Sequence, residues 1–272
     1  MPEKKSSSVN WWAVLISIVV GAPLLVVGYV TVQTWVPLQK AGKALDELDQ
    51  SLGAAATYRP TASGEIPADR MERFLELRTT LVSACEGYGK VQKAFESIDS
   101  LEARDSKDAK EVGNAVLGLG GAALEITPFL ARYFELRNDA LLAASMGLQE
   151  YCYIYAVAYH DLLLAESTRH EIFSDDLALS PKASETLRQC LTRQLEDLRQ
   201  SDDQAARTTE VRAELEKMEG DPARLIWQDR LPDAIHASVA PYREALDRLF
   251  CPATAGLEME RSSRRAIAVA LE

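Results

Sequence analysis

Residue types that often carry catalysis or metal binding are scarce in this chain of 272 residues, which has three histidines and four cysteines. The counts of Cys, Gly and Pro are ordinary for the length, which excludes small disulfide scaffolds and collagen-like chains. Basic residues are in deficit, with 30 Lys and Arg against 41 Asp and Glu. Because phosphate neutralisation needs clustered Lys and Arg, we expect no nucleic-acid partner. The apolar fraction of 47% excludes a disordered chain.

Local motifs for catalysis and cofactor binding are also missing from the sequence. It contains no GxSxG, HExxH or CxxC pattern, and its glycine-rich stretch lacks the preceding strand that a phosphate-binding loop requires. Glu166 and His170 lie four residues apart, but an isolated pair supplies too few ligands for a metal ion. We therefore assign no catalytic, cofactor-binding or metal-binding residue, and an enzyme is the less favoured interpretation.

An uncharged stretch extends from Ser6 to Gln39 near the amino terminus. A helix needs about 20 apolar residues to cross about 30 Å of hydrocarbon. Trp11 and Trp12 mark one edge of the apolar part, and Tyr29 and Trp35 mark the other, as in aromatic belts at membrane interfaces. No signal-peptidase pattern closes the run. We predict that residues 11–36 are an uncleaved transmembrane anchor in the lipid bilayer, after a short tail of residues 1–10.

Flanking lysines orient this predicted anchor only weakly. Lys4 and Lys5 precede it, and Lys40 and Lys43 follow it, so the positive-inside count is nearly tied. Long domains translocate largely regardless of charge, whereas a short amino-terminal tail usually stays inside. We therefore predict a cytoplasmic amino terminus and a domain in the periplasm or outside the cell.

The rest of the chain favours helices, because strand patterns are nearly absent and apolar residues recur at spacings of three and four. Residues 37–53 read as a juxtamembrane amphipathic helix that packs into the domain or, alternatively, forms a short dimer stalk. Residues 67–251 read as a helical bundle, and residues 252–272 as a tail. The predicted fold class is all-α, with one N-terminal transmembrane helix followed by an antiparallel bundle of five to seven helices.

Within the bundle we expect one helix from Pro67 to about residue 100, with Arg78 beside its apolar seam as a solvated flank. Further helices are expected over 129–145, 148–165 and 184–218, followed by two shorter ones broken at prolines. The sequence RFLELR at residues 73–78 resembles RYFELR at 132–137, with four of six positions identical. This similarity indicates either a duplicated helical hairpin or the restricted alphabet of amphipathic helices.

One helix carries an unusual number of aromatic residues. Tyr151, Tyr155 and Tyr159 recur every four residues and therefore share one face of a helix. Core packing explains such a stripe, and so does a ligand cleft or a partner-binding patch.

The pairing of the cysteines bears on the compartment, because a disulfide indicates an oxidising one. Cys190 and Cys251 lie at equal distances on either side of the turn at residues 220–222, so two straight antiparallel helices would bring them level. We predict a possible disulfide between them, with Cys85 and Cys152 as buried thiols.

These features favour a single-pass membrane-anchored protein that acts non-enzymatically as a protein-binding scaffold, adaptor or complex subunit at the cell envelope. The partner's identity is not encoded in any motif. The alternative is an extracytoplasmic small-ligand-binding domain or, less favoured, an enzyme whose site is dispersed over the sequence.

Overall fold

The computed structural model describes residues 39–40, 42–44, 46–52, 57–102, 129–169, 180–200 and 204–260. This part of the chain is helical and contains no strands, which confirms the all-α prediction. None of its helices is both long enough and apolar enough to cross a membrane. The predicted anchor at 11–36 and the tail at 1–10 lie outside the described residues.

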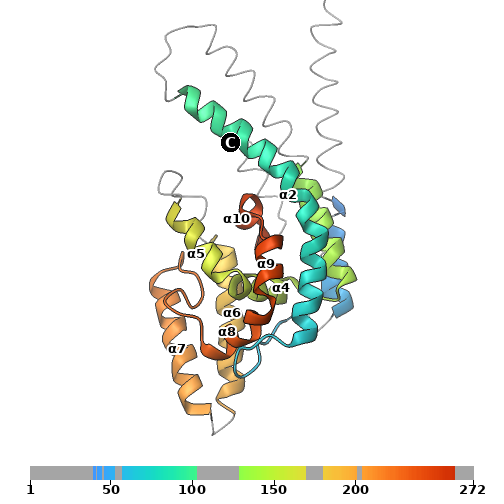
Figure 1. The fold of residues 1–272 in the computed structure, drawn as a ribbon. Helices are drawn as coiled ribbons and strands as arrows, with labels where there is room; N and C mark the ends of the chain where they lie inside the picture. The colour runs from blue at the N-terminus through green and yellow to red at the C-terminus, as the bar shows by residue number, and fades with distance from the viewer. Residues whose placement is uncertain are drawn as a thin grey trace, which may run out of the picture.

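Figure 1 labels the helices, whose bounds are as follows: α2 Ala68–Glu102, α4 Leu148–Ala158, α5 His160–Arg169, α6 Pro181–Leu198, α7 Ala205–Gly220, α8 Asp233–Val239, η3 Ala240–Tyr242, α9 Arg243–Leu249, η4 Pro252–Thr254 and α10 Ala255–Glu258. Residues 129–143 form a further helix, and the described residues of 39–52 are helical as well. The described part thus has more helices than the five to seven predicted, because two predicted helices are split and residues 252–258 of the predicted tail are helical.

Helix α2 begins directly after Pro67, as predicted, because a proline at a helix start loses no hydrogen bond. Its first half buries the expected apolar seam, including Phe74, Leu77 and Leu81, against the rest of the molecule. Arg78 is buried too, so the expectation of a solvated flank is wrong. The seam therefore places a charged side chain inside the domain.

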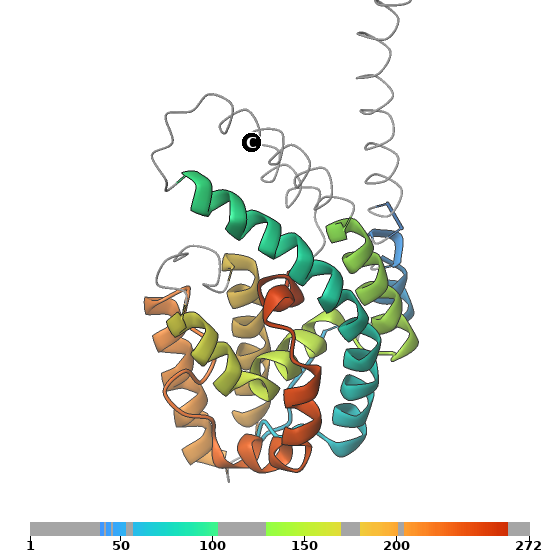
Figure 2. The ribbon, with the colours of Figure 1, turned by 45° about the horizontal axis from the view of Figure 1, so that its top comes forward.

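Helix α4 lies at the centre of the fold (Figure 2), and nine consecutive residues from Glu150 to Ala158 are buried. A helix that is apolar on all sides is a core helix. The predicted helix over 148–165 is two helices, because the backbone leaves helical geometry at Tyr159 and starts again in α5. The tyrosine stripe is therefore on the central element of the domain.

The predicted single helix over 184–218 is wrong, because α6 ends at Leu198 and α7 starts at Ala205. The two helices pack side by side (Figures 1 and 2). No leucine or valine occurs between Leu198 and Val211, so a straight continuation of α6 would have had no apolar seam to bury. The chain turns at Arg199 and Gln200 instead.

The carboxyl-terminal part breaks at Pro232 and Pro241, as predicted, and α9 ends before Cys251. Residues 252–260 do not form the separate tail that was predicted. They form η4 and α10, and η4 packs against α2. We call residues 250–260 the strap.

The helical residues of 39–52 pack into the domain. Ala44 and Leu48 are buried, and Leu48 belongs to the main apolar core, with Leu52 packed against it. This arrangement favours bundle packing over the stalk alternative for residues 37–53, since the seam is already covered within one chain.

Candidate functional site

The tyrosine stripe lies inside the domain rather than on its surface. Tyr151, Tyr155 and Tyr159 are each 0% exposed, and their rings contact one another in sequence along α4. Two open grooves on the surface have volumes of about 530 and 660 Å³, and neither is lined by these tyrosines. The core-packing interpretation of the stripe therefore agrees with the structure, and an open patch or cleft made by these rings does not.

A charged side chain lies against the stripe. The guanidinium of Arg78 sits over the rings of Tyr155 and Tyr159, at 5.3 and 5.5 Å from their centroids. Within the described part of the chain, the hydroxyls of these two tyrosines have no hydrogen-bond partner. The third hydroxyl, of Tyr151, accepts a hydrogen bond from Arg78 Nη1 at 3.0 Å and donates one to Glu258. The stripe thus leads to a buried carboxylate.

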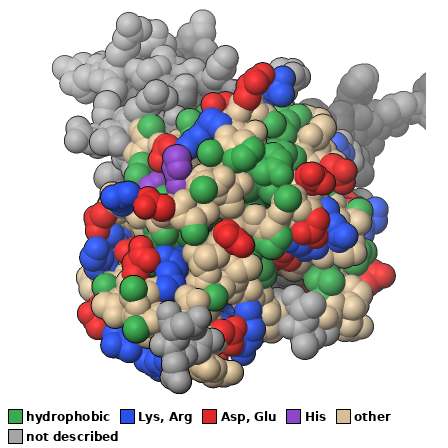
Figure 3. All heavy atoms as spheres, turned by 60° about the horizontal axis from the view of Figure 1, so that its bottom comes forward, with side chains coloured by type: hydrophobic (Ala, Val, Ile, Leu, Met, Phe, Trp, Pro, Cys, Tyr) green, Lys and Arg blue, Asp and Glu red, His purple; other side chains and the backbone are tan. Residues whose placement is uncertain are grey.

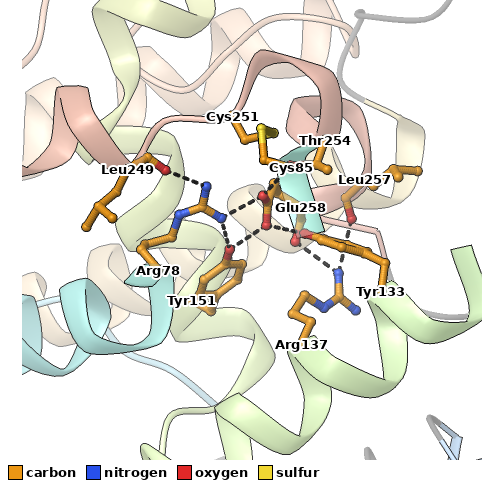
Figure 4. Close-up of polar contacts among 10 residues, drawn as sticks. All are labelled: Arg78, Cys85, Tyr133, Arg137, Tyr151, Leu249, Cys251, Thr254, Leu257 and Glu258. Atoms are coloured by element: carbon orange, nitrogen blue, oxygen red, sulfur yellow. Dashed lines mark hydrogen bonds and ion pairs between the residues drawn. A yellow bond between two sulfur atoms is a disulfide. The ribbon is translucent and has the colours of Figure 1, made fainter. Parts of the chain in front are cut away.

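Glu258, at the end of α10, is the centre of a buried polar network (Figure 4). Its Oε1 accepts hydrogen bonds from Arg78 Nη1 at 2.6 Å and from Thr254 Oγ1 at 2.8 Å. Its Oε2 accepts hydrogen bonds from the hydroxyls of Tyr151, at 2.5 Å, and Tyr133. Four donors from three separate helices and the strap therefore surround one carboxylate.

Two arginines also bind backbone carbonyls, one at the end of α9 and the other in the strap. Arg78 Nη2 donates to the carbonyl of Leu249 at 3.0 Å, at the end of α9. Arg137 Nη1 donates to the carbonyls of Leu257 and Glu258 at 3.1 and 3.0 Å. Carbonyls at the end of a helix lack partners within it, so a guanidinium is a suitable cap for them.

The charge states follow from burial and from these partners. Burial by itself raises the pKa of Glu258, but the Arg78 charge and the hydrogen bonds from Tyr133 and Tyr151 lower it below its ordinary value of 4.5. Burial raises the pKa of Tyr133 and Tyr151 well above 10, so both phenols remain protonated donors. The site contains an ionised carboxylate paired with an ionised guanidinium at 0% exposure of both side chains.

The two copies of the six-residue pattern, residues 73–78 and 132–137, both contribute side chains to this site. Arg78 and Arg137 occupy its last position in the two copies, and both bind the strap. Phe74 and Tyr133 occupy its second position, four residues earlier on the same helix face. Phe74 contacts the ring of Tyr151, and Tyr133 binds Glu258. The repeat was thus the one sequence signal that marked both arginines, although it did not identify Glu258.

The disulfide partner of Cys251 is Cys85 on α2, with Cα atoms 5.8 Å apart. The predicted Cys190–Cys251 pairing is wrong, and so is the expectation that Cys85 is a thiol. Equal distances along the chain would bring Cys190 and Cys251 together only if one straight helix preceded the turn at 220–222, whereas α6 and α7 fold back on each other. The observed bond joins the strap to α2 close to Arg78 and Glu258 (Figure 4).

The other two cysteines remain thiols. Cys152 is buried, as predicted, and Cys190 is buried as well. Burial raises the pKa of each thiol to about 12. Since the thiolate is the reactive form, both are inert at neutral pH.

The histidine that could have supported a dispersed catalytic site is held by backbone and by its neighbour. His160 is buried, with Nε2 2.9 Å from the carbonyl oxygen of Trp227 and Nδ1 3.2 Å from Asp161. Within the described part of the chain, no group of three His, Cys, Asp or Glu side chains could hold a metal ion. The side chains of Glu166 and His170 lie outside that part.

The polar groups of this site hold the strap in place. Every oxygen of the carboxylate is used by a donor of the same chain, and both side chains of the ion pair are shielded from water. Comparisons with protein-family models, with curated proteins and with solved structures each find no match.

Proposed function

We propose that the chain is a single-pass membrane-anchored protein whose helical domain binds another protein at the cell envelope, as a scaffold, adaptor or complex subunit. The observation that carries this proposal is the bond between Cys85 and Cys251. Disulfides persist in oxidising compartments and are kept reduced in the cytosol. A bond inside the domain therefore supports the orientation with a cytoplasmic amino terminus, which the flanking lysines leave nearly tied.

The second support is how the domain uses its buried polar groups. Arg78, Arg137 and Glu258 hold helices to one another, and Arg70 is paired with Glu150 through two hydrogen bonds of 2.5 and 2.6 Å. Such use favours a structural domain that presents its surface to a partner. The alternative, a small-ligand cleft walled by Tyr155 or Tyr159, loses its argument because both rings are in the core.

The surface offers several kinds of contact to a partner. Figure 3 shows hydrophobic side chains gathered on part of one face, with charged side chains of both signs around them. A hydrophobic area within a polar rim is typical of protein–protein interfaces. Four helices, α2, α6, α7 and α8, each contain an exposed position suited to a photoreactive residue: Thr80, Thr192, Ala213 and Ala237.

Orientation is tested with protease on sealed membrane vesicles. In inside-out vesicles the domain should be protected, because it faces the lumen, and should be digested when detergent opens them. Digestion without detergent would place the domain in the cytoplasm and remove the envelope part of the proposal.

Partner binding is tested by photocrosslinking in intact cells from the four exposed positions, one at a time. We expect a discrete adduct, identifiable by mass spectrometry, from one or two neighbouring positions. Leu187 is the matched negative control, since its side chain is buried in α6. The absence of a discrete adduct from all four positions would contradict a protein-binding role.

A further inference from the structure

The strap is held by specific polar contacts and by apolar packing, rather than by its own secondary structure. Ala255 and Met259 belong to the main apolar core, and Phe250 packs against it. Helix α10 of the strap has four residues, Ala255–Glu258, and so short a helix does not persist alone in water. The polar contacts come from α2, from the helix at 129–143 and from α4. One covalent bond, Cys85–Cys251, ties the strap to α2 at its beginning.

The groups facing the strap form a site built for one kind of ligand. Arg78, Tyr133 and Tyr151 all donate to a single carboxylate, and Arg137 donates to two consecutive carbonyls. All four side chains are at least 99% buried, and they come from three different helices. Charge-assisted hydrogen bonds of this kind select a glutamate at the end of a short helical turn.

We propose that Arg78, Tyr133, Arg137 and Tyr151 form a peptide-binding site that the strap occupies as a tethered ligand, and that the Cys85–Cys251 bond controls its release. When the bond is reduced, a segment of a partner with the same chemistry, a helical turn that ends in glutamate, exchanges with the strap. This inference names the partner chemistry for the proposed scaffold role and rests on that role only for the partner's existence.

The polar character of this contact supports exchange. A buried ion pair adds less stability than apolar packing of the same volume, and its best-attested use is to specify one arrangement among several. A tethered segment competes with an external one at a high effective concentration. The disulfide adds to that advantage, because it fixes the beginning of the strap beside the site.

The reduction step requires a dithiol reductant. Cys85 is half-buried, whereas Cys251 is buried, so a reductant thiolate attacks the Cys85 sulfur and Cys251 leaves as a thiolate, which takes up a proton. This attack leaves a mixed disulfide between Cys85 and the first sulfur of the reductant. The second thiol of the reductant then attacks that first sulfur and releases Cys85 as a thiol. Two electrons and two protons pass to the protein, and the reductant becomes a disulfide.

The test uses the full chain in detergent and a fluorescent peptide of residues 250–260 that carries Cys251→Ser, so that it cannot form a mixed disulfide. Fluorescence anisotropy should show that the peptide binds the reduced protein at least about tenfold more tightly than the oxidised protein. A second peptide with Glu258→Gln should bind the reduced protein at least about tenfold more weakly than the first. Equal affinity of the two redox forms, equal affinity of the two peptides, or no binding would overturn the proposal.

The matched control is the full chain with Cys85→Ser and Cys251→Ser. It should bind the peptide with and without reductant, because it lacks the disulfide that retains the strap. Hydrogen exchange on the reduced wild-type protein should speed up at residues 250–260 while α6 and α7 keep their protection. Loss of protection throughout the domain would show that the bond stabilises the whole domain and would contradict its proposed control over release of the strap. The peptide experiment involves no cellular partner, so it fails or succeeds independently of photocrosslinking in cells.

Discussion

The strap and helix α6 show two different ways of holding a segment in place. Helix α6 buries Leu187, Leu191 and Leu195 in a continuous seam and leaves its ion pairs at the surface. The strap has a four-residue helix and buries only Ala255 and Met259 in the main core, and its one ionised carboxylate has 0% exposure. Truncating one leucine of a seam removes only part of its contribution to the free energy of unfolding. Removing either partner of a buried ion pair leaves the other charge unpaired and abolishes the interaction. The strap is therefore the part of this domain that one chemical change can release.

Removal of the central carboxylate should have the largest effect. Glu258→Ala leaves Arg78 charged and unpaired in the core, and truncating one partner of such a pair costs about 3–5 kcal/mol. Urea unfolding of the purified protein measures the change in the free energy of unfolding. A loss below about 1 kcal/mol would mean that the strap is held in some other way and would remove the contrast with α6.

Removal of the disulfide should come next. The Cys85→Ser and Cys251→Ser variant frees the strap from α2 and should lower the free energy of unfolding by about 2–4 kcal/mol. The matched variant Cys190→Ala keeps the bond and changes only a buried thiol of α6, so it should cost less. If both variants lost the same stability, the bond would have no special role at the strap.

Acid should weaken the strap selectively. The pKa of Glu258 is lower in the folded state than its ordinary value of 4.5, so its contribution is complete above that value and is lost as the pH falls through the folded-state pKa. The stability gap between wild type and Glu258→Gln should therefore narrow as the pH falls from about 7 to about 3. A gap that stays constant or widens over this range would show that Glu258 is not ionised in the native protein.

The smallest effect is expected at the surface of α6. Asp197→Ala breaks an ion pair with Arg59 in which the two charged groups lie 2.6 Å apart. The side chain of Arg59 is 49% exposed and that of Asp197 is 43% exposed. Exposed pairs contribute about 0–1 kcal/mol, and Arg59 keeps a second partner in Glu196. Urea unfolding should show a loss within that range. A loss as large as that of Glu258→Ala would contradict the distinction between the two regions.

The sequence predicted the parts of the fold that depend on local periodicity. The leucine seam of α6, the start of α2 after Pro67 and the breaks at Pro232 and Pro241 are all observed. These features follow from rules that act within one or two helical turns. The helix predicted over 184–218 was too long because its thin seam continued across a polar turn.

The strap could not be predicted in the same way. Glu258 lies in a short stretch without a periodic pattern, and its partners come from residues 78, 133 and 151, far away in the chain. Arg78 was assigned to solvent because a charged side chain next to a seam is usually exposed. Only the similarity between residues 73–78 and 132–137 hinted that the two arginines share an environment, and a single sequence gives no means of telling this from coincidence.

Disulfide mapping on the native protein decides whether the strap is covalently held to α2. Protein isolated from its native membranes is alkylated without reduction and digested, and the linked peptides are identified by mass spectrometry. We predict one linked pair, Cys85 with Cys251, and alkylated Cys152 and Cys190 once the protein is denatured. A Cys190–Cys251 peptide, or four free thiols, would contradict both the covalent hold on the strap and the oxidising compartment proposed for the domain.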